Sequence, residues 1–233
     1  MSGRLFGVGV GPGDPELMTL KAHRLIASAK VLAYPVLENG DSFARAIAAD
    51  SFKGARHEIK VTIPITTRRE PAQAAYDAGA EKIAAVLETG QDVVMLCEGD
   101  PLFYGSFMYI LARLEGRFPV EVVPGVTSVS ASAASLARPL VARNDQLAII
   151  PGPLGADRMR ARINESDAVA IMKVGRHLPK IRAVLADLGL VDRAVYIERA
   201  SLGTERRMPL AEAPENAPYF SMILMTRGGD PWL

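Results

Sequence analysis

The chain has 233 residues, 49% hydrophobic and 23% charged, which suits one large or two small packed domains and excludes a disordered polymer. Its formal net charge of +1 excludes a protein-wide electrostatic field for nucleic acid. No apolar run approaches the ~18 residues of a membrane span, and the N-terminus lacks the basic-then-apolar order of a secretory signal. We therefore expect a cytoplasmic protein that binds neither nucleic acid nor membranes.

The chain has too few cysteines and histidines for an internal disulfide or a zinc site. The single cysteine, Cys97, cannot form an internal disulfide, and its apolar surroundings in the sequence predict a buried thiol. Three scattered histidines and this cysteine lack zinc-ligand spacing, so no metal is expected. Arginine outnumbers lysine by 20 to 7, which suits a polyanionic small ligand, although codon usage in a GC-rich genome explains the bias more simply.

Strand-like and helix-like segments alternate along the first half of the chain. Apolar runs predict strands at residues 4–10, 30–36, 92–97 and 119–123, the second of them ended by Pro35. Apolar residues at helical spacing predict helices at residues 15–29, 71–90 and 104–116, two of them closed by a glycine. This alternation favours a mostly parallel sheet covered by helices.

The second half repeats this alternation after a polar, proline-containing stretch at residues 136–146, which we interpret as a crossover into a second unit. Further strands are predicted at residues 147–152, 168–174, 194–199 and 219–227, separated by helix-length segments such as 178–189. We therefore predict an α/β protein with two domains, residues 1–123 and 124–233, each built on a mostly parallel sheet.

The glycine-rich opening at residues 7–14 resembles a nucleotide-phosphate loop but fails its rules. A dinucleotide fingerprint needs glycines at i, i+2 and i+5, and the last position is Pro12 counted from Gly7, or Asp14 counted from Gly9. A phosphate cradle also needs backbone N–H donors, which proline lacks, while an aspartate repels the anion. The loop is therefore suited to a neutral or cationic ligand.

Similar turns follow three later strands, at residues 98–106, 123–128 and 150–153. Each alone is ordinary turn chemistry. Ligands of open α/β sheets bind beyond the carboxyl ends of the strands, so several glycine-rich turns at such ends predict one shared site.

The ordered motifs GVGPGDPELMTLKA (9–22), EGDPLFYGS (98–106) and VPGVTS (123–128) resemble those of the tetrapyrrole (corrin/porphyrin) methylases. The resemblance extends over essentially the whole chain. It implies two α/β domains with the active site in the cleft between them, S-adenosyl-L-methionine (SAM) as methyl donor and a homodimer. The cationic sulfur of SAM agrees with the missing phosphate cradle.

Within that family, residues 33–48, 63–71 and 97–110 are most similar to the precorrin-2 C20-methyltransferases of cobalamin biosynthesis. Uroporphyrinogen methylases usually have an acidic residue after the second strand, where this chain has Tyr34 and Pro35. This difference favours the C20 enzymes. Metal-free and cobalt-containing substrates both remain open, because relatives of both kinds share the motifs.

The resemblance also implies which residues contact SAM. These are Pro12, Glu98, Gly99, Asp100, Phe103, Thr127, Ser128, Met172 and Ala200. The match at Ala200 is looser, because related members often have Asn-Gly there.

Methyl transfer from a sulfonium needs aligned reactants and a group that accepts the C20 proton, but no metal. By position, Tyr34 and Glu98 are the catalytic candidates, with Glu38 a third. For the substrate carboxylates we expect Arg68, Arg69 and Arg176. Further cations in the same kind of loop are Lys173, His177, Arg206 and Arg207. Taken singly, each of these groups is better explained by packing, by loop order or as a solvated charge.

Three other functions remain to be separated from C20 methylation. Another enzyme of the same fold, such as a different corrin methylase or diphthine synthase, would share the motifs but act elsewhere. A nicotinamide dehydrogenase would need the absent glycine fingerprint. A non-catalytic tetrapyrrole-binding module would not need SAM, so calorimetry with SAM distinguishes it.

Overall fold

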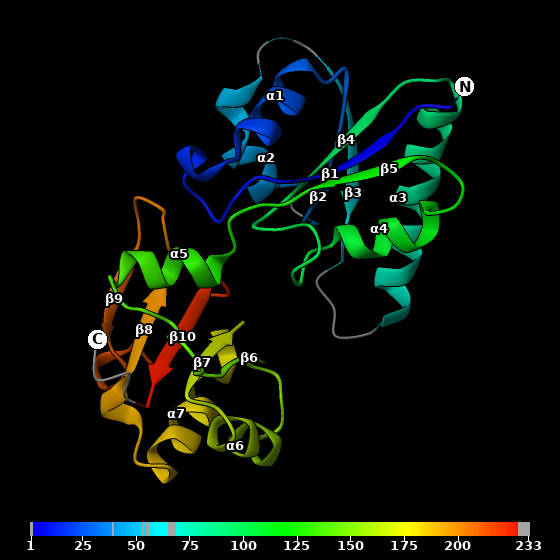
Figure 1. Cartoon of the computed structure of the whole chain (residues 1–233). Coiled ribbons are helices and arrows are strands. Elements are labelled where there is room, and N and C mark those ends of the chain that lie inside the picture. The colour runs from blue at the N-terminus through cyan, green and yellow to red at the C-terminus, as the bar shows by residue number, and fades with distance from the viewer. Residues whose placement is uncertain (1, 39, 53, 55, 65–68, 228–233) are drawn as a thin grey trace. The chain divides into compact units, whose positions relative to one another are not determined.

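The computed structural model describes residues 2–38, 40–52, 54, 56–64 and 69–227 (Figure 1). The chain divides into two compact units, Met1–Thr127 and Ser128–Leu233. The boundary expected after residue 123 falls four residues earlier than this division. The stretch 136–146, expected to connect the units, lies inside the second one.

The first unit contains a five-stranded sheet in the order β3-β2-β4-β1-β5. The strands are β1 (Leu5–Gly9), β2 (Val31–Val36), β3 (His57–Thr62), β4 (Val93–Cys97) and β5 (Val120–Val123). Every pair is parallel, which confirms the prediction for this unit. The sequence analysis missed β3, whose alternating exposed and buried residues are typical of a half-covered edge strand. Pro35 lies inside β2 and does not end it.

Helices cover both faces of this sheet. They are α1 (Leu20–Ser28), α2 (Phe43–Ile47), α3 (Arg69–Glu88) and α4 (Phe107–Leu114). Buried residues of α3 and α4 pack on one face, and those of α1 and α2 pack on the other. The helix expected from residue 15 begins only at Leu20, because Thr19 is extended and its hydroxyl caps the helix by accepting the N–H of Ala22. A separate 3-10 turn, Pro15–Leu17, precedes it and is capped by Asp14.

The second unit has a mixed sheet in the order β6-β7-β10-β8-β9. Its strands are β6 (Leu147–Pro151), β7 (Ala168–Met172), β8 (Ala194–Glu198), β9 (Arg206–Pro209) and β10 (Ser221–Thr226). Only β6 and β7 are parallel, whereas β10 runs antiparallel to both of its neighbours and β9 to β8. The expected mostly parallel sheet is therefore wrong for this unit. The last strand enters between β7 and β8 in the opposite direction, which hydrophobicity alone does not reveal.

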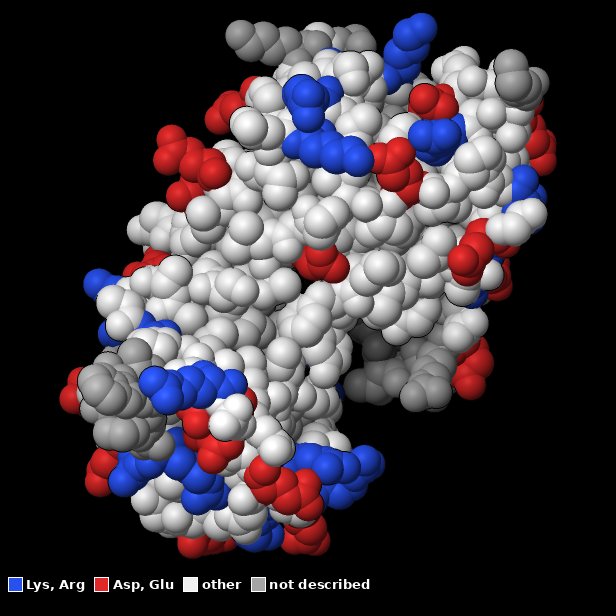
Figure 2. Space-filling view, in the orientation of Figure 1, with Lys and Arg blue, Asp and Glu red and all other residues white. Residues whose placement is uncertain are grey.

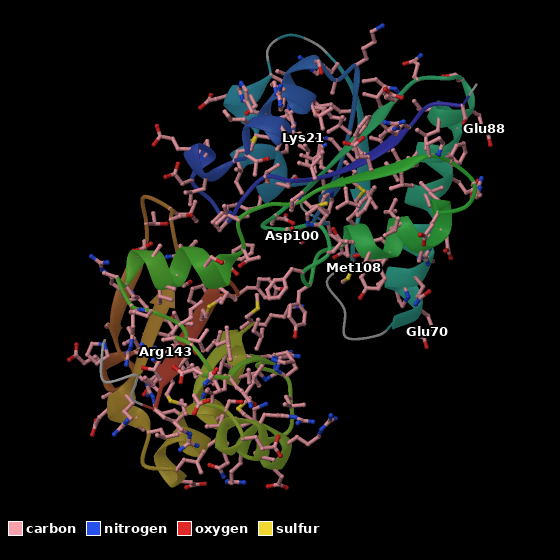
Figure 3. The ribbon with its side chains drawn as sticks, viewed as in Figure 1. Lys21, Glu70, Glu88, Asp100, Met108 and Arg143 are labelled. Carbon is pink, nitrogen blue, oxygen red and sulfur yellow. The ribbon has the colours of Figure 1, made fainter. Side chains whose placement is uncertain are left out.

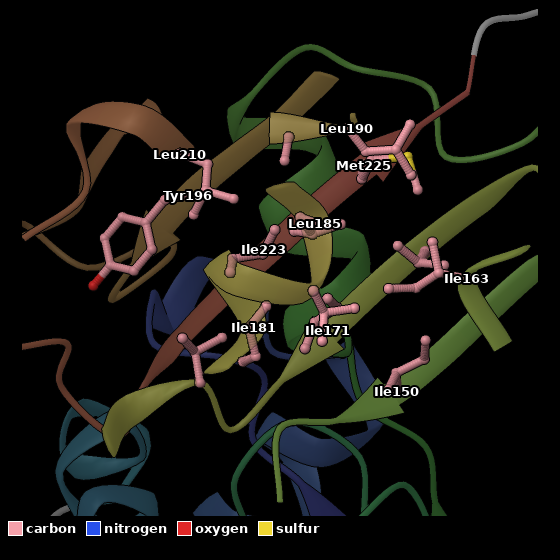
Figure 4. Packing of buried hydrophobic residues seen from close by; sticks show 14 of the residues in the cluster. Ile150, Ile163, Ile171, Ile181, Leu185, Leu190, Tyr196, Leu210, Ile223 and Met225 are labelled. Carbon is pink, nitrogen blue, oxygen red and sulfur yellow. The ribbon is translucent and has the colours of Figure 1, made fainter. Parts of the chain in front are cut away.

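One face of the second sheet packs against α6 (Ala156–Asn164) and α7 (Leu178–Asp187). Figure 4 shows this core, in which Ile171 and Ile223 from the sheet meet Ile181 and Leu185 from α7. The ring of Tyr196 belongs to the same core, with its hydroxyl directed away from the aliphatic side chains. Helix α5 (Ser128–Ser135) lies on the opposite face, in front of β8 and β10 in Figure 1.

On the face in Figure 2, Lys and Arg side chains alternate with Asp and Glu side chains over both units. Within the described ranges, no helix is both long and apolar enough to cross a membrane.

Candidate functional site

Three of the predicted loops meet at one edge of the first sheet. Strand β1 lies between β4 and β5, and all three are parallel, so their carboxyl ends are neighbours. Hydrogen bonds then extend the pairing into the loops. The N–H of Gly99 donates to the carbonyl of Gly11 at 2.8 Å, and the N–H of Gly11 donates back at 3.3 Å. The segments 10–14, 98–106 and 124–127 thus form one edge.

Glycine makes this close approach possible. A Cβ atom on Gly125 would lie 2.0 Å from the carbonyl oxygen of Gly99 and 3.0 Å from the Cα of Gly9. A Cβ on Gly9 would in turn lie 2.6 Å from the same oxygen. Gly99 also has φ +61°, which favours glycine at that position. The three backbones therefore pack directly on one another, an arrangement that side chains would prevent.

Asp100 joins the second loop to the third (Figure 3). Its Oδ2 accepts the N–H of Gly125 at 3.0 Å, and its Oδ1 accepts the N–H of Leu102 at 2.9 Å. Phe103 follows in the same turn, where its N–H donates to the carbonyl of Asp100 and its ring packs edge-on against Tyr104. Asp100 thus orders both loops.

The chemistry of this edge suits a cation better than a phosphate. Pro12 has no N–H, and the carboxylate of Asp14 accepts the N–H of Glu16 at 2.9 Å, which places negative charge at the first loop. Glu98 and Asp100 add carboxylates to the second. A cationic sulfonium is compatible with these carboxylates and with the missing N–H, so the residues present fit SAM.

Glu98 is a partly buried carboxyl group of the edge. Burial raises its pKa, and backbone hydrogen bonds, including one from Ala44, act in the opposite direction. A raised pKa makes a carboxylate a better proton acceptor near neutral pH. Glu38, by contrast, is exposed in the loop after β2.

Tyr34 is only 1% exposed and packs in the core beneath α1 and α2. Its hydroxyl donates to the carboxylate of Glu58, which also accepts from Nε and Nη2 of Arg45 at 2.7 and 2.9 Å. Burial, followed by the bond to Glu58, raises the pKa of Tyr34 above its usual value of 10, so the phenol stays protonated at neutral pH. This geometry favours a structural role for Tyr34 over proton transfer.

The hydroxyl pair expected to contact SAM lies where the two units join in the sequence. Thr127 is the last residue of the first unit, and Ser128 is the first residue of α5 in the second. Both are partly buried.

The other two predicted SAM contacts share one edge of the second sheet. Met172 ends β7, and Ala200 follows the end of β8, and both strands run antiparallel to β10. Their carboxyl ends therefore lie at the same edge, one strand apart. The 150–153 turn joins them there, because the N–H of Gly152 donates to the carbonyl of Met172 at 2.7 Å.

The turn that contains Ala200 is held by two acidic side chains that the sequence analysis did not single out. Glu198, 3% exposed, accepts the Tyr196 hydroxyl at 2.6 Å, and its other oxygen lies 3.4 Å from the guanidinium of Arg199. Glu205 accepts the N–H of Ser201 at 2.7 Å and the hydroxyl of Ser135 in α5. Arg199 and Ser201 have φ +53° and +68°, so this turn is strained on both sides of Ala200.

The structure describes the three arginines predicted to bind substrate to different extents. Arg68 lies outside the described residues, and Arg69 is known only as the first residue of α3. Arg176 is exposed in the 3-10 turn Gly175–His177, four residues after Met172, at the same edge of the second sheet. In the part of the chain that the structure describes, no group of three or more His, Cys, Asp or Glu residues could hold a metal ion. The predicted burial of Cys97 is confirmed.

Comparisons with known proteins identify the family of the chain. Residues 4–214 match the model of the Tetrapyrrole (Corrin/Porphyrin) Methylases. The chain is 30% identical to a uroporphyrin-III C-methyl transferase from Thermus thermophilus whose structure contains S-adenyl homocysteine. That alignment covers 96% of this chain and 97% of the other, with a TM-score of 0.68. The chain therefore belongs to the tetrapyrrole methylases.

Three curated relatives are similar to nearly the whole of this chain. A precorrin-2 C(20)-methyltransferase from a Sinorhizobium species is 43% identical, over 96% of this chain and 95% of that protein. The cobalamin biosynthesis protein CobIJ of Mycobacterium tuberculosis is 42% identical over 97% of this chain, which spans about half (46%) of that longer relative. A cobalt-precorrin-2 C(20)-methyltransferase from Salmonella typhimurium is 30% identical, over 97% and 98% of the two chains.

Proposed function

We propose that the protein is a SAM-dependent methyltransferase that methylates C20 of metal-free precorrin-2, giving precorrin-3A in cobalamin biosynthesis. The observation that carries the proposal is the 43% identity, over nearly the full length of both chains, to the Sinorhizobium C20 enzyme. The lower identity of 30% to the Salmonella enzyme for the cobalt form favours the metal-free substrate. Cobalt-precorrin-2 is the second candidate.

SAM, when bound, supplies a methyl group that its sulfonium charge already activates. We assign its binding to the residues that the family resemblance implies, which are Pro12, Glu98, Gly99, Asp100, Phe103, Thr127, Ser128, Met172 and Ala200. Support comes from the hydrogen bonds that join the loops at Gly11 and Gly99, and from the hydrogen bond of Glu205 to Ser201 in the turn that contains Ala200. The product would be S-adenosyl-L-homocysteine.

In this proposal the residues of the chain orient the reactants, exclude water and accept one proton. The loop edge of the first unit has its hydrogen bonds in place before any ligand arrives, so little conformational entropy is lost on binding. Glu98 is the proposed proton acceptor, since burial raises its pKa toward the working range. Arg176 is proposed to bind a substrate carboxylate, as are Arg68 and Arg69. A homodimer in the cytoplasm completes the proposal.

A methylation assay tests the function directly. Purified protein is incubated without oxygen with methyl-labelled SAM and either metal-free precorrin-2 or its cobalt form, and carbon NMR locates the label. Label at C20 of the metal-free substrate supports the proposal, and label at C20 of the cobalt form alone supports the second candidate. Label at another carbon, or binding of SAM without transfer, contradicts both.

A further inference from the structure

Two large aromatic side chains are exposed next to each other just before β10. Tyr219 is 64% exposed and Phe220 is 47% exposed. Their rings pack edge to face, with centroids 5.2 Å apart and planes at 78°. Adjacent exposed aromatic groups of this size are typical of a surface that another molecule covers. We call them the aromatic pair.

The backbone under the aromatic pair is fixed. The N–H of Arg199 donates to the carbonyl of Phe220 at 2.8 Å, and the N–H of Ser221 donates to the carbonyl of Tyr219 at 2.9 Å. The Ser221 hydroxyl also donates to the carbonyl of Pro218 at 2.6 Å. The two side chains therefore extend from a backbone that is ordered before binding, which reduces the entropy that a ligand must overcome.

The aromatic pair lies at the edge of the second sheet that carries Met172 and Ala200. Strand β10 begins there, because it runs antiparallel to β7 and β8, which end there. A Cβ on Gly175 would lie 3.9 Å from the Cα of Tyr219, so the turn containing Arg176 is adjacent.

The same edge of the second sheet also carries exposed arginines. Guanidinium groups of Arg199 and Arg206 lie 3.4 and 3.6 Å from the same oxygen of Glu198, and their side chains are 42% and 58% exposed. One carboxylate thus faces two arginines, and Arg176 adds a third exposed cation. A ligand that matches this edge is flat, apolar on its face and carboxylated at its rim.

We infer that the aromatic pair is the surface on which the macrocycle of the tetrapyrrole substrate packs, with its rim carboxylates bound by Arg199 and Arg206. This inference rests on the proposed function and names substrate contacts that it did not contain. The adenine of SAM is also flat, but SAM carries a single carboxylate, on its methionine end, whereas the tetrapyrrole carries several around its rim. Two arginines at this edge therefore suit the tetrapyrrole better. Arg199 and Arg206 remain held by Glu198 in the absence of substrate.

Binding measurements with stable probes test the inference. The variant Tyr219→Leu/Phe220→Leu keeps apolar side chains but removes both flat rings. We expect its dissociation constant for uroporphyrin III, followed by porphyrin fluorescence, to rise about tenfold, because leucine offers no flat face on which the macrocycle can stack. The exchange variant Tyr219→Phe/Phe220→Tyr is the matched control and should bind within about threefold of the wild type. Coproporphyrin III, with fewer carboxylates, should bind the wild type less tightly.

Calorimetry with S-adenosyl-L-homocysteine provides the opposing measurement. Its affinity should be equal in all three proteins. If the leucine variant loses affinity for S-adenosyl-L-homocysteine and for the porphyrin equally, the pair binds adenine and the inference is overturned. Unchanged porphyrin affinity in the leucine variant would also overturn it. A change in sedimentation would assign the pair to a second copy of the chain, with the same consequence. Because both rings are largely exposed, the variant should fold, and the single change Tyr219→Leu provides a milder test.

The two proposals fail in different ways. If the wild type binds uroporphyrin III through the aromatic pair but places no label on C20, the proposed function fails and the tetrapyrrole surface stands. If it methylates C20 and the leucine variant retains the wild-type KM for precorrin-2, only the surface assignment fails. A wild type without affinity for any tetrapyrrole overturns both.

Discussion

The two sheet edges that carry the predicted SAM contacts are built in different ways. In the first unit, the backbones of Gly9, Gly99 and Gly125 pack directly together, with one aspartate joining the loops. In the second unit, the turn around Ala200 is shaped by side chains, chiefly Glu198 and Glu205, from different positions in the fold. An edge made of backbone tolerates no added atom, whereas an edge made of side chains tolerates changes that keep its hydrogen bonds.

The largest loss is expected for Gly125→Ala. Its Cβ would lie 2.0 Å from a backbone oxygen, so the three loops would have to separate. We expect a loss of more than about 3 kcal/mol in the free energy of unfolding, measured with urea, together with loss of SAM binding. Gly155→Ala is the control, because nothing lies within 4 Å of its Cβ, and it should cost under about 1 kcal/mol. Equal stability of the two variants would contradict the close packing.

A smaller loss, about 2 kcal/mol at neutral pH, is expected for Glu58→Gln, which removes a charge-assisted acceptor of Arg45. The hydrogen bond from Arg45 is the main cause that lowers the pKa of Glu58 from 4.5 to about 2. The folded state thus binds this proton less tightly than the unfolded state, so the stabilisation is present above about pH 4.5 and is lost as the pH falls toward 2.

Urea unfolding at pH 7 and pH 3 measures this effect. The difference between wild type and Glu58→Gln should be smaller at pH 3. Glu165→Gln, which removes an exposed ion pair with Arg162, is the control and should change stability by under about 0.5 kcal/mol at both pH values. If the difference in unfolding free energy between wild type and Glu58→Gln is the same at both pH values, the carboxylate charge is not involved.

Glu205→Ala should cost about 1–2 kcal/mol, because the N–H of Ser201 and the hydroxyl of Ser135 lose their acceptor. We also expect weaker binding of S-adenosyl-L-homocysteine, measured by calorimetry. Glu205→Gln should restore both properties, since its amide oxygen accepts from Ser201 and its amide nitrogen donates to the Ser135 hydroxyl. If Gln fails to restore them, the charge and not the hydrogen bonding holds the turn.

The smallest effect on stability is expected for Glu98→Gln. Burial raises the pKa of this carboxyl, so its ionised form is disfavoured in the folded state, and a neutral amide should leave the Tm equal or higher at pH 7. If Glu98 accepts the C20 proton, kcat should fall on the order of 100-fold. Unchanged kcat would leave Glu98 with only the ordering of its loop. Tyr34→Phe is the companion variant, for which we expect little change in kcat.

The first edge could be predicted from local sequence motifs. Its glycines and Pro12 act through the local backbone conformation that each permits or forbids, so their spacing after apolar strands predicts where the loops lie. The α/β class was predicted from the alternation of strand-like and helix-like segments, and the motifs were specific enough to indicate the family.

The second edge depends on contacts between residues that are distant in the sequence. The antiparallel entry of β10 places Phe220 beside Arg199, and α5 brings Ser135 to Glu205, 70 residues away. The sequence analysis also interpreted Tyr34 as a candidate base, whereas its hydroxyl is bound by Glu58, 24 residues further on. Hydrogen bonds and ion pairs between distant residues depend on which strands become neighbours, and hydrophobic periodicity does not specify that choice.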